Sequence, residues 1–174
     1  NGNTTANGNW TFTNNVSVDT LTANHIEQVG TFAEIYYADA STAQSFPNGT
    51  TYTKITSFTT DGEESNCTAD AANDKITITE TGYYEVTGYF STICTTNGTV
   101  GKTALFLGGN EVNKIHKQST WTNTVSSHSG SIGGIIKVET VPIDIDVRLR
   151  HDQGAPVNFT GVYGNLSVRK IGDL

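Results

Sequence analysis

The fold is decided by the stretch Thr81-Gly82-Tyr83-Tyr84-Glu85-Val86-Thr87-Gly88-Tyr89-Phe90-Ser91, which has the two-residue period of a β-strand. In such a strand Tyr84, Val86 and Phe90 point to one face, and Tyr83 and Tyr89 point to the other. A two-layer β-sandwich has only one interior, so a strand with apolar residues on both faces needs a second cover. A contact between subunits is the simplest cover of this kind.

The last strand that the sequence predicts, over residues 157–171, has the same two-faced character. Phe159 and Tyr163 oppose Val162, Leu166 and Val168, so aromatic and aliphatic side chains lie on opposite faces if the alternation is regular. We therefore predict a subunit interface formed by the exposed faces of the two strands, with the residues Tyr83, Tyr89, Phe159 and Tyr163.

A period of two continues from Thr31 onward, and Gly108-Gly109-Asn110 is the clearest hairpin signal in the chain. Residues 61–74 and 119–130 are predicted to be polar loops, the first of them with a cluster of acidic residues. About nine short strands without a helical pattern favour an all-β sandwich or jelly roll. The predicted strands are residues 32–37, 51–58, 75–80, 83–93, 102–107, 111–117, 131–139, 143–150 and 157–171.

Residues 1–30 differ from the rest of the chain because their apolar residues are too few to close a core. Such a stretch needs a partner surface or sister chains. We predict a docking arm over residues 1–30 and a β-sandwich domain over residues 31–174. The stripe of the arm that contacts its partner is formed by Trp10, Phe12, Val16, Val18 and Leu21.

The net charge of −7 and the scatter of the 10 basic residues argue against nucleic-acid binding, which needs clustered Lys and Arg. No apolar run approaches the roughly 20 residues that span a bilayer, so membrane insertion is not expected. Cys67 and Cys94 are too few for a disulfide scaffold and are interpreted as two unpaired thiols.

The sequence has no constellation of catalytic residues, and neither an enzyme nor a bound cofactor is expected. It lacks a Gly-x-Ser-x-Gly elbow and a phosphate-binding Gly-rich loop, and its histidines lack the spacing of a zinc site. The acidic residues of the 61–74 segment form either a calcium site or, as we favour because the spacing fits no known calcium loop, a solvated loop. The acidic residues of that segment are Asp61, Glu63, Glu64 and Asp70. Asp144, Asp146, Arg148 and Arg150 are interpreted as mutual ion pairs, with an ion-pair network between subunits as the alternative.

Four motifs in order over residues 31–171 resemble the C1q/TNF-like domain family. Residues 81–91 resemble the central strand of the family, and 102–112 resemble the hairpin that follows it. Ser129-Gly130-Ser131 with residues 141–149, and then residues 157–162, are similar to the late strands of the family. The resemblance implies a jelly roll of ten strands and a tight homotrimer with aromatic residues around a threefold axis.

Residues 16–24 resemble the joints of bacteriophage fibre and virion appendage proteins, in which C1q/TNF-like jelly rolls occur as knobs and capsid decorations. The leading hypothesis is therefore a non-enzymatic phage virion protein, a homotrimeric knob whose arm binds capsid or tail proteins. Its role would be capsid decoration or attachment to a host-surface glycan or protein. The alternatives are a secreted or cell-surface C1q/TNF-like ligand and a carbohydrate-binding β-sandwich in which Trp121 stacks on sugars.

Overall fold

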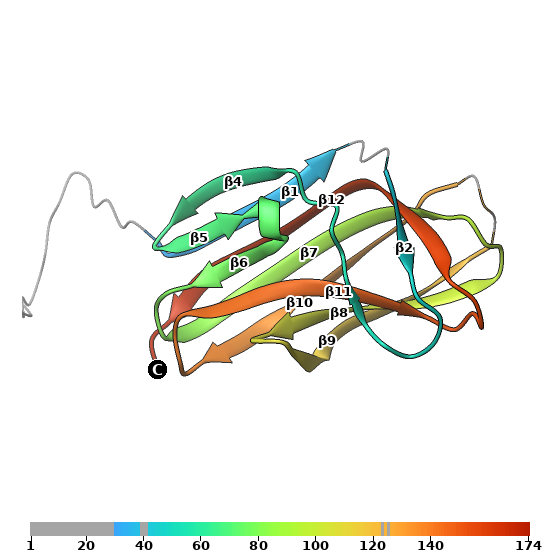
Figure 1. Cartoon of the computed structure of the whole chain (residues 1–174). Helices are drawn as coiled ribbons and strands as arrows, with labels where there is room; N and C mark the ends of the chain where they lie inside the picture. The colour runs from blue at the N-terminus through green and yellow to red at the C-terminus, as the bar shows by residue number, and fades with distance from the viewer. Residues whose placement is uncertain (1–29, 39–41, 123, 125) are drawn as a thin grey trace, which may run out of the picture.

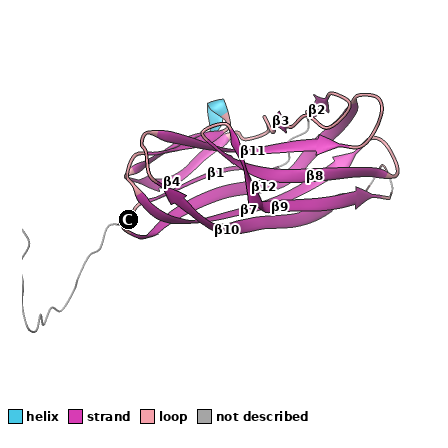
Figure 2. Ribbon diagram, turned by 90° about the horizontal axis from the view of Figure 1, so that it is seen from below, coloured by secondary structure: helices cyan, strands magenta, loops and turns pink. Residues whose placement is uncertain are grey.

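The computed structural model describes residues 30–174 except 39–41, 123 and 125, and this part of the chain forms two antiparallel sheets packed face to face (Figure 1). Figure 2 shows the two layers, which are almost entirely strand. The alternation of apolar and polar residues produces this arrangement because each sheet buries one face against the other. The prediction of an all-β fold is confirmed.

The first sheet has the strand order β10–β7–β12–β1–β4, and β2 pairs with the N-terminal end of β12. Its strands are β1 (Phe32–Ala38), β2 (Ala43–Phe46), β4 (Thr60–Ser65), β7 (Gly82–Cys94), β10 (His128–Val138) and β12 (Val157–Gly172). The second sheet has the order β5–β6–β11–β8–β9, and β3 pairs with β11. Its strands are β3 (Thr53–Lys54), β5 (Cys67–Asp70), β6 (Lys75–Ile78), β8 (Thr99–Leu107), β9 (Asn110–Trp121) and β11 (Ile143–His151).

The core lies between the sheets and is built from every second residue of the long strands. Tyr84 and Val86 of β7 are fully buried, as the alternation in residues 81–91 predicts. Other side chains that are buried at this level are Ile35, Ile76, Ile78, Leu105, Ile115, Ile145, Val147, Leu166 and Val168. The core therefore uses one face of each sheet and leaves the other face of each sheet outside.

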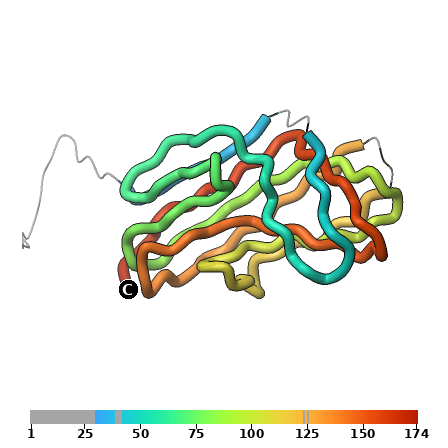
Figure 3. The backbone as a smooth tube through the Cα atoms, viewed as in Figure 1, coloured from blue at the N-terminus to red at the C-terminus, as the bar shows by residue number. Residues whose placement is uncertain are grey.

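The segment between β2 and β4 crosses the outer face of the second sheet, in front of β11 (Figure 3). A strand over residues 51–58 was predicted here, and this prediction is wrong because only β3 pairs. The buried side chains of Ile55 and Phe58 fix the rest of the segment, and the Ile55 amide donates to the Val147 carbonyl oxygen at 2.9 Å. The apolar residues of this segment are therefore buried although most of the segment does not pair as a strand.

The acidic stretch 61–74 is not a loop but contains β4, β5 and a short 3₁₀ helix, η1 (Ala71–Asn73). Its carboxylates accept hydrogen bonds from backbone amides, so they support local structure. Asp61 accepts from the Ala71 amide at 2.6 Å, and Glu64 accepts from the Ala69 amide at 2.5 Å. The turn between β4 and β5 places Asn66 at a φ of 52°, a conformation that Asn tolerates.

Gly108 and Gly109 form the tight turn between β8 and β9, as the hairpin signal predicts, with φ values of 55° and 81°. β9 continues to Trp121 and β10 begins at His128, so the predicted loop 119–130 loses residues at both ends. Within the described residues, no helix is long and apolar enough to cross a membrane.

The residues of the predicted docking arm, from Trp10 to Leu21, lie outside the described residues, and the domain boundary at residue 30 stays a prediction. At that boundary Thr31 is already part of the sandwich. Its carbonyl oxygen accepts from the Lys170 amide at 2.8 Å, and its hydroxyl donates to Glu80 at 3.1 Å.

Candidate subunit interface

The outer face of the first sheet carries most of the exposed apolar side chains in the described part of the chain. Six of the eight large apolar residues that are exposed there belong to β1, β7, β10 and β12. Tyr89 is 45% exposed and Tyr163 is 51% exposed. The six residues are Tyr36, Tyr83, Tyr89, Ile135, Tyr163 and Ile171, and we call the side of the sheet that carries them the tyrosine face.

The predicted interface residues Tyr83, Tyr89 and Tyr163 are thus brought to one sheet, whereas Tyr36 was missed by the sequence analysis. The strand register places Tyr89 beside Asn165 of β12, and Asn165 beside Tyr36 of β1. The signal for Tyr36 was present, because the run from Ile35 to Tyr37 is apolar on both faces, as β7 is.

Polar side chains fill the middle of the tyrosine face and link its strands. The Asn165 side chain accepts from the Tyr89 amide at 3.1 Å and donates to Glu34 at 3.0 Å. The hydroxyls of Thr87 and Ser167 lie 2.7 Å apart on the neighbouring strands. These bonds tie β1, β12 and β7 together, so the face is held as one surface.

A hollow of about 400 Å³ lies at one end of the face, between Glu34, Glu85 and Arg169. Arg169 pairs with Glu85 at 2.8 Å, and both side chains remain well exposed. An exposed pair of this kind contributes little to the stability of the single chain. A surface with aromatic rings, a polar middle and a hollow has the mixed composition typical of protein–protein interfaces.

Phe159 does not belong to this face, and its assignment to the interface is wrong. It is 3% exposed and packs in the core against the rings of Phe46 at 5.4 Å and Trp121 at 4.9 Å. The cause is a β-bulge between Gly161 and Tyr163, which adds one residue to β12 and reverses the facing of everything before it. Tyr163 therefore points outward while Phe159 points inward, although four residues separate them.

Two glycines at the bulge make room for a tyrosine from β1. A β-carbon at Gly161 would lie 2.6 Å from the ring of Tyr37, and one at Gly164 would lie 2.4 Å from it. Side-chain atoms do not approach this closely, so both positions need glycine while Tyr37 lies across β12. Burial raises the pKa of Tyr37 well above its usual range.

Trp121 is not available for stacking on a sugar, because its ring is 3% exposed. The indole N–H donates to the Thr92 carbonyl oxygen at 3.1 Å, and the ring packs edge-on against Phe159. The carbohydrate-binding alternative loses the residue on which it depended. The sequence was misleading here because Trp121 sits in a stretch rich in Ser, Thr and Asn, yet it ends β9 and faces the core.

The charged residues of β11 lie on the second sheet away from the tyrosine face, and only one of the mutual ion pairs predicted for them, Asp146–Arg148, is present. Asp144 pairs instead with Lys75 of β6, and Arg150 has no carboxylate partner among the described residues. Arg148 binds Asp146 through two bonds, of 2.7 and 3.0 Å. Partial burial opposes ionisation of Asp144, but hydrogen bonds from Thr77 and Lys75 outweigh it and lower the pKa of Asp144. These residues stabilise the outer surface of the second sheet.

The two cysteines are free and buried, as interpreted from the sequence, although Cys67 begins β5 and does not lie in a loop. Burial raises the pKa of the Cys67 thiol to about 11, which keeps it protonated and unreactive near neutral pH. Among the residues that the structure describes, no group of three His, Cys, Asp or Glu side chains is arranged to hold a metal ion.

Comparison with known proteins places the fold. No protein-family model and no curated protein matches the sequence. The structure superposes on Eiger TNF from S. frugiperda with a TM-score of 0.57 and 11% identity, over 84% of this chain and 96% of that one. The chain folds as a TNF-like jelly roll.

Two further structures share this jelly roll. Murine APRIL superposes with a TM-score of 0.51 and 11% identity, over 82% of this chain and 100% of that one. The PRD1 vertex protein P5 superposes with a TM-score of 0.50 and 17% identity, over 84% of this chain and 100% of that one. The C1q/TNF-like fold expected from the four sequence motifs is confirmed, and it occurs both in TNF proteins and in a phage vertex protein.

Proposed function

We propose that the chain is a non-enzymatic phage virion protein that assembles as a homotrimeric knob and acts in capsid decoration or host-surface attachment. The observation that carries this proposal is the tyrosine face, an apolar surface that a monomer would leave in water. The likeness to the PRD1 vertex protein supports the virion as its location. The threefold arrangement is what the resemblance to C1q/TNF-like domains implies.

The mass of the purified chain in solution tests the assembly. At micromolar concentration we expect light scattering to give about three times the 18.6 kDa of one chain. The physical reason is the area of half-exposed rings on the tyrosine face, since burial of apolar surface stabilises by about 25 cal/mol per Å². A mass near 18.6 kDa at this concentration would show that the tyrosine face is not a subunit contact.

Residues 1–30 are proposed as the arm that binds capsid or tail proteins. A chain that begins at Gly30 should still assemble as a trimer and should keep its melting temperature, because the sandwich is closed without the arm. The same chain should lose its binding to purified capsids or tails in a co-sedimentation assay. If the shortened chain unfolds, the N-terminal residues belong to the jelly roll and the boundary at residue 30 is wrong.

A secreted TNF-like ligand is the second candidate, supported by the likeness of the fold to Eiger and APRIL. Both candidates use the same assembly, so the mass in solution does not separate them. The neighbouring genes distinguish the two candidates. Capsid or tail genes beside the coding sequence support the virion protein, whereas an upstream secretion signal or collagen repeat supports the ligand.

A further inference from the structure

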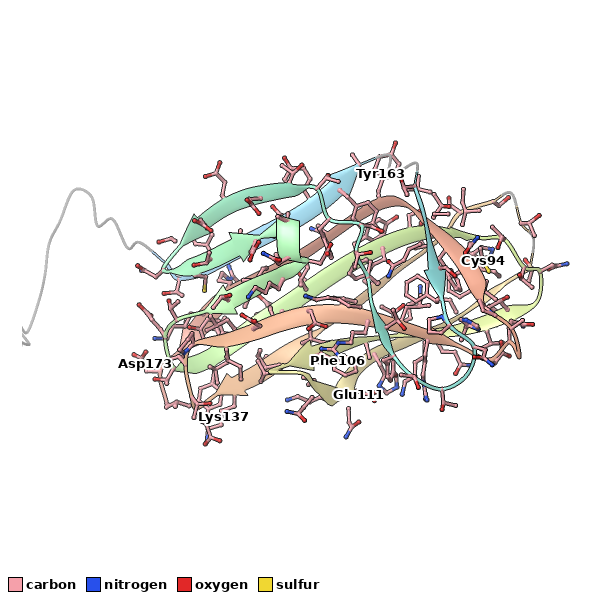
Figure 4. All side chains as sticks on the ribbon, in the orientation of Figure 1. Cys94, Phe106, Glu111, Lys137, Tyr163 and Asp173 are labelled. Carbon is pink, nitrogen blue, oxygen red and sulfur yellow. The ribbon has the colours of Figure 1, made fainter. Side chains whose placement is uncertain are left out.

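A second hollow lies on the outer face of the second sheet, on the opposite side of the sandwich from the tyrosine face. It has a volume of about 210 Å³, and Thr50, Lys102, Gln118, Arg150 and Asp152 are among the residues that line it. We call it the Arg150 hollow. Figure 4 labels Phe106 and Glu111 on this side of the molecule, away from Tyr163.

Two cations are direct neighbours in this hollow. Arg150 of β11 is paired in register with Lys102 of β8, and Lys102 with Gln118 of β9. Like charges directly opposite each other on neighbouring strands destabilise a sheet. This arrangement is unexpected in a chain whose net charge is −7, where carboxylates outnumber basic residues 17 to 10.

The charge of Lys102 is partly compensated, but that of Arg150 is not. Lys102 pairs with Glu111 at 3.4 Å. Within the described residues Arg150 has no carboxylate partner, and its one hydrogen bond runs to the Thr50 carbonyl oxygen at 3.2 Å. A guanidinium with five N–H donors therefore retains donors for an anion.

The Arg150 side chain is held in place before any ligand arrives. Its guanidinium lies 4.9 Å from the centre of the Tyr52 ring, and Tyr52 packs edge-on against Phe106. The Tyr52 hydroxyl donates to Glu111 at 3.0 Å, which fixes the ring. A pre-organised guanidinium loses little conformational entropy on binding, and it matches the two oxygens of a carboxylate or sulfate.

The remaining lining is suited to hydroxyl groups. The Gln118 amide and the Thr50 hydroxyl both donate and accept. Asp152 accepts from the Val100 amide at 2.9 Å through one carboxylate oxygen, and the other oxygen accepts no hydrogen bond from the described part of the chain. The volume lies below the roughly 300–1,000 Å³ of sites for drug-sized ligands and corresponds to a single small ring.

We propose that the Arg150 hollow binds one residue of an acidic saccharide, with its carboxylate or sulfate on Arg150 and Lys102 and its hydroxyls on Gln118 and Asp152. The ligand gives host-surface attachment a chemical class, and its biological role rests on the proposed function. The binding itself needs no assembly, because the hollow belongs to one chain and lies away from the tyrosine face.

The test is a calorimetric titration of the full chain with glucuronic acid, sulfated N-acetylglucosamine and unmodified N-acetylglucosamine. We expect the acidic sugars to bind at least about tenfold more tightly than the neutral one, as loss of a charge-assisted contact predicts. The acidic sugar that binds more tightly identifies whether a carboxylate or a sulfate is the natural group. Equal affinity for acidic and neutral sugars would overturn the proposal.

Variants tie the binding to this hollow. Arg150→Gln should weaken it at least about tenfold, and Gln118→Trp, at an exposed position, should abolish it by filling the hollow. Lys114→Gln is the matched control, since it removes the same charge from an exposed lysine that does not line the hollow. Melting curves confirm that each variant is folded.

Two outcomes contradict the proposal while leaving the trimer and virion role intact. Unchanged binding by Arg150→Gln would place the sugar elsewhere. Inorganic sulfate that binds as tightly as the sulfated sugar would reduce the hollow to a simple anion site. A monomeric mass, by contrast, would remove the proposed assembly without affecting the sugar titration.

Discussion

Replacing Tyr89 with aspartate is expected to convert the assembled chain into a folded monomer. Tyr89 lies near the middle of the tyrosine face, between Ser131 of β10 and Asn165 of β12. Burial of an aromatic ring contributes about 1.5–3 kcal/mol, and a carboxylate in a dry contact costs several kcal/mol more. Three copies around an axis also repel one another, so the association constant should fall by more than about a hundredfold.

The fold itself should tolerate this change. Tyr89 is 45% exposed in the single chain, so an aspartate there remains in water. The hydrogen bond to Asn165 is made by the backbone amide of residue 89 and survives the substitution. Light scattering should therefore give a mass near 18.6 kDa, with an unchanged far-ultraviolet dichroism spectrum.

Thr122→Asp is the control for the charge, because Thr122 is an exposed residue outside the strands. It should leave both the mass and the melting temperature of the chain unchanged. An assembled Tyr89→Asp variant would mean that the contact uses another surface. Assembly lost in both variants would mean that added negative charge alone prevents association.

The facing of β7 was predictable because its alternation of exposed and buried residues is unbroken from Gly82 to Phe90. Tyr83 and Tyr89 are outside and Tyr84, Val86 and Phe90 are inside, and no bulge interrupts the pairing with β10. The same rule failed on β12 because one extra residue changes the facing of everything beyond it. Gly161 and Gly164 were the available signal, since glycine inside a strand often marks a bulge.

The missed strands have a different cause. β4 and β5 carry few apolar residues, so their sequence resembles a loop, and the pairing of β4 depends on a strand that is distant in the sequence. Phe32 of β1 pairs with Ser65 of β4, whereas β5 forms a hairpin with β6 around η1, in which Thr68 pairs with Thr77. No local pattern encodes the partner of β4, because pairing between distant strands is a property of the packed fold.

The Arg150 hollow was beyond the sequence for the same reason. The pattern of β11 predicted ion pairs for all its charges, yet the register sets Arg150 opposite another cation. Thr50 comes from a segment that crosses β11 without being an extended strand, so its carbonyl contact with Arg150 has no sequence signature. Local pattern thus gave the layers and one face, whereas register and crossings determined the sites.

Replacing Phe159 with alanine is expected to lower the free energy of unfolding by about 3–5 kcal/mol, because it leaves a cavity in the core. The ring is almost fully buried and contacts the rings of Phe46, Trp121 and His151. Tyr163→Ala, on the same strand but beyond the bulge, should cost less than about 1 kcal/mol, as exposed positions usually do.

Urea denaturation in the Tyr89→Asp background measures both changes without a contribution from assembly. The contrast between the two aromatic residues follows from the bulge between Gly161 and Tyr163 and from nothing else on the strand. With a regular strand, Phe159 and Tyr163 would share one face and the two substitutions would have similar effects. Equal losses for Phe159→Ala and Tyr163→Ala would therefore contradict the bulge, whereas a difference of several kcal/mol would confirm that Phe159 holds the core while Tyr163 is left for the interface.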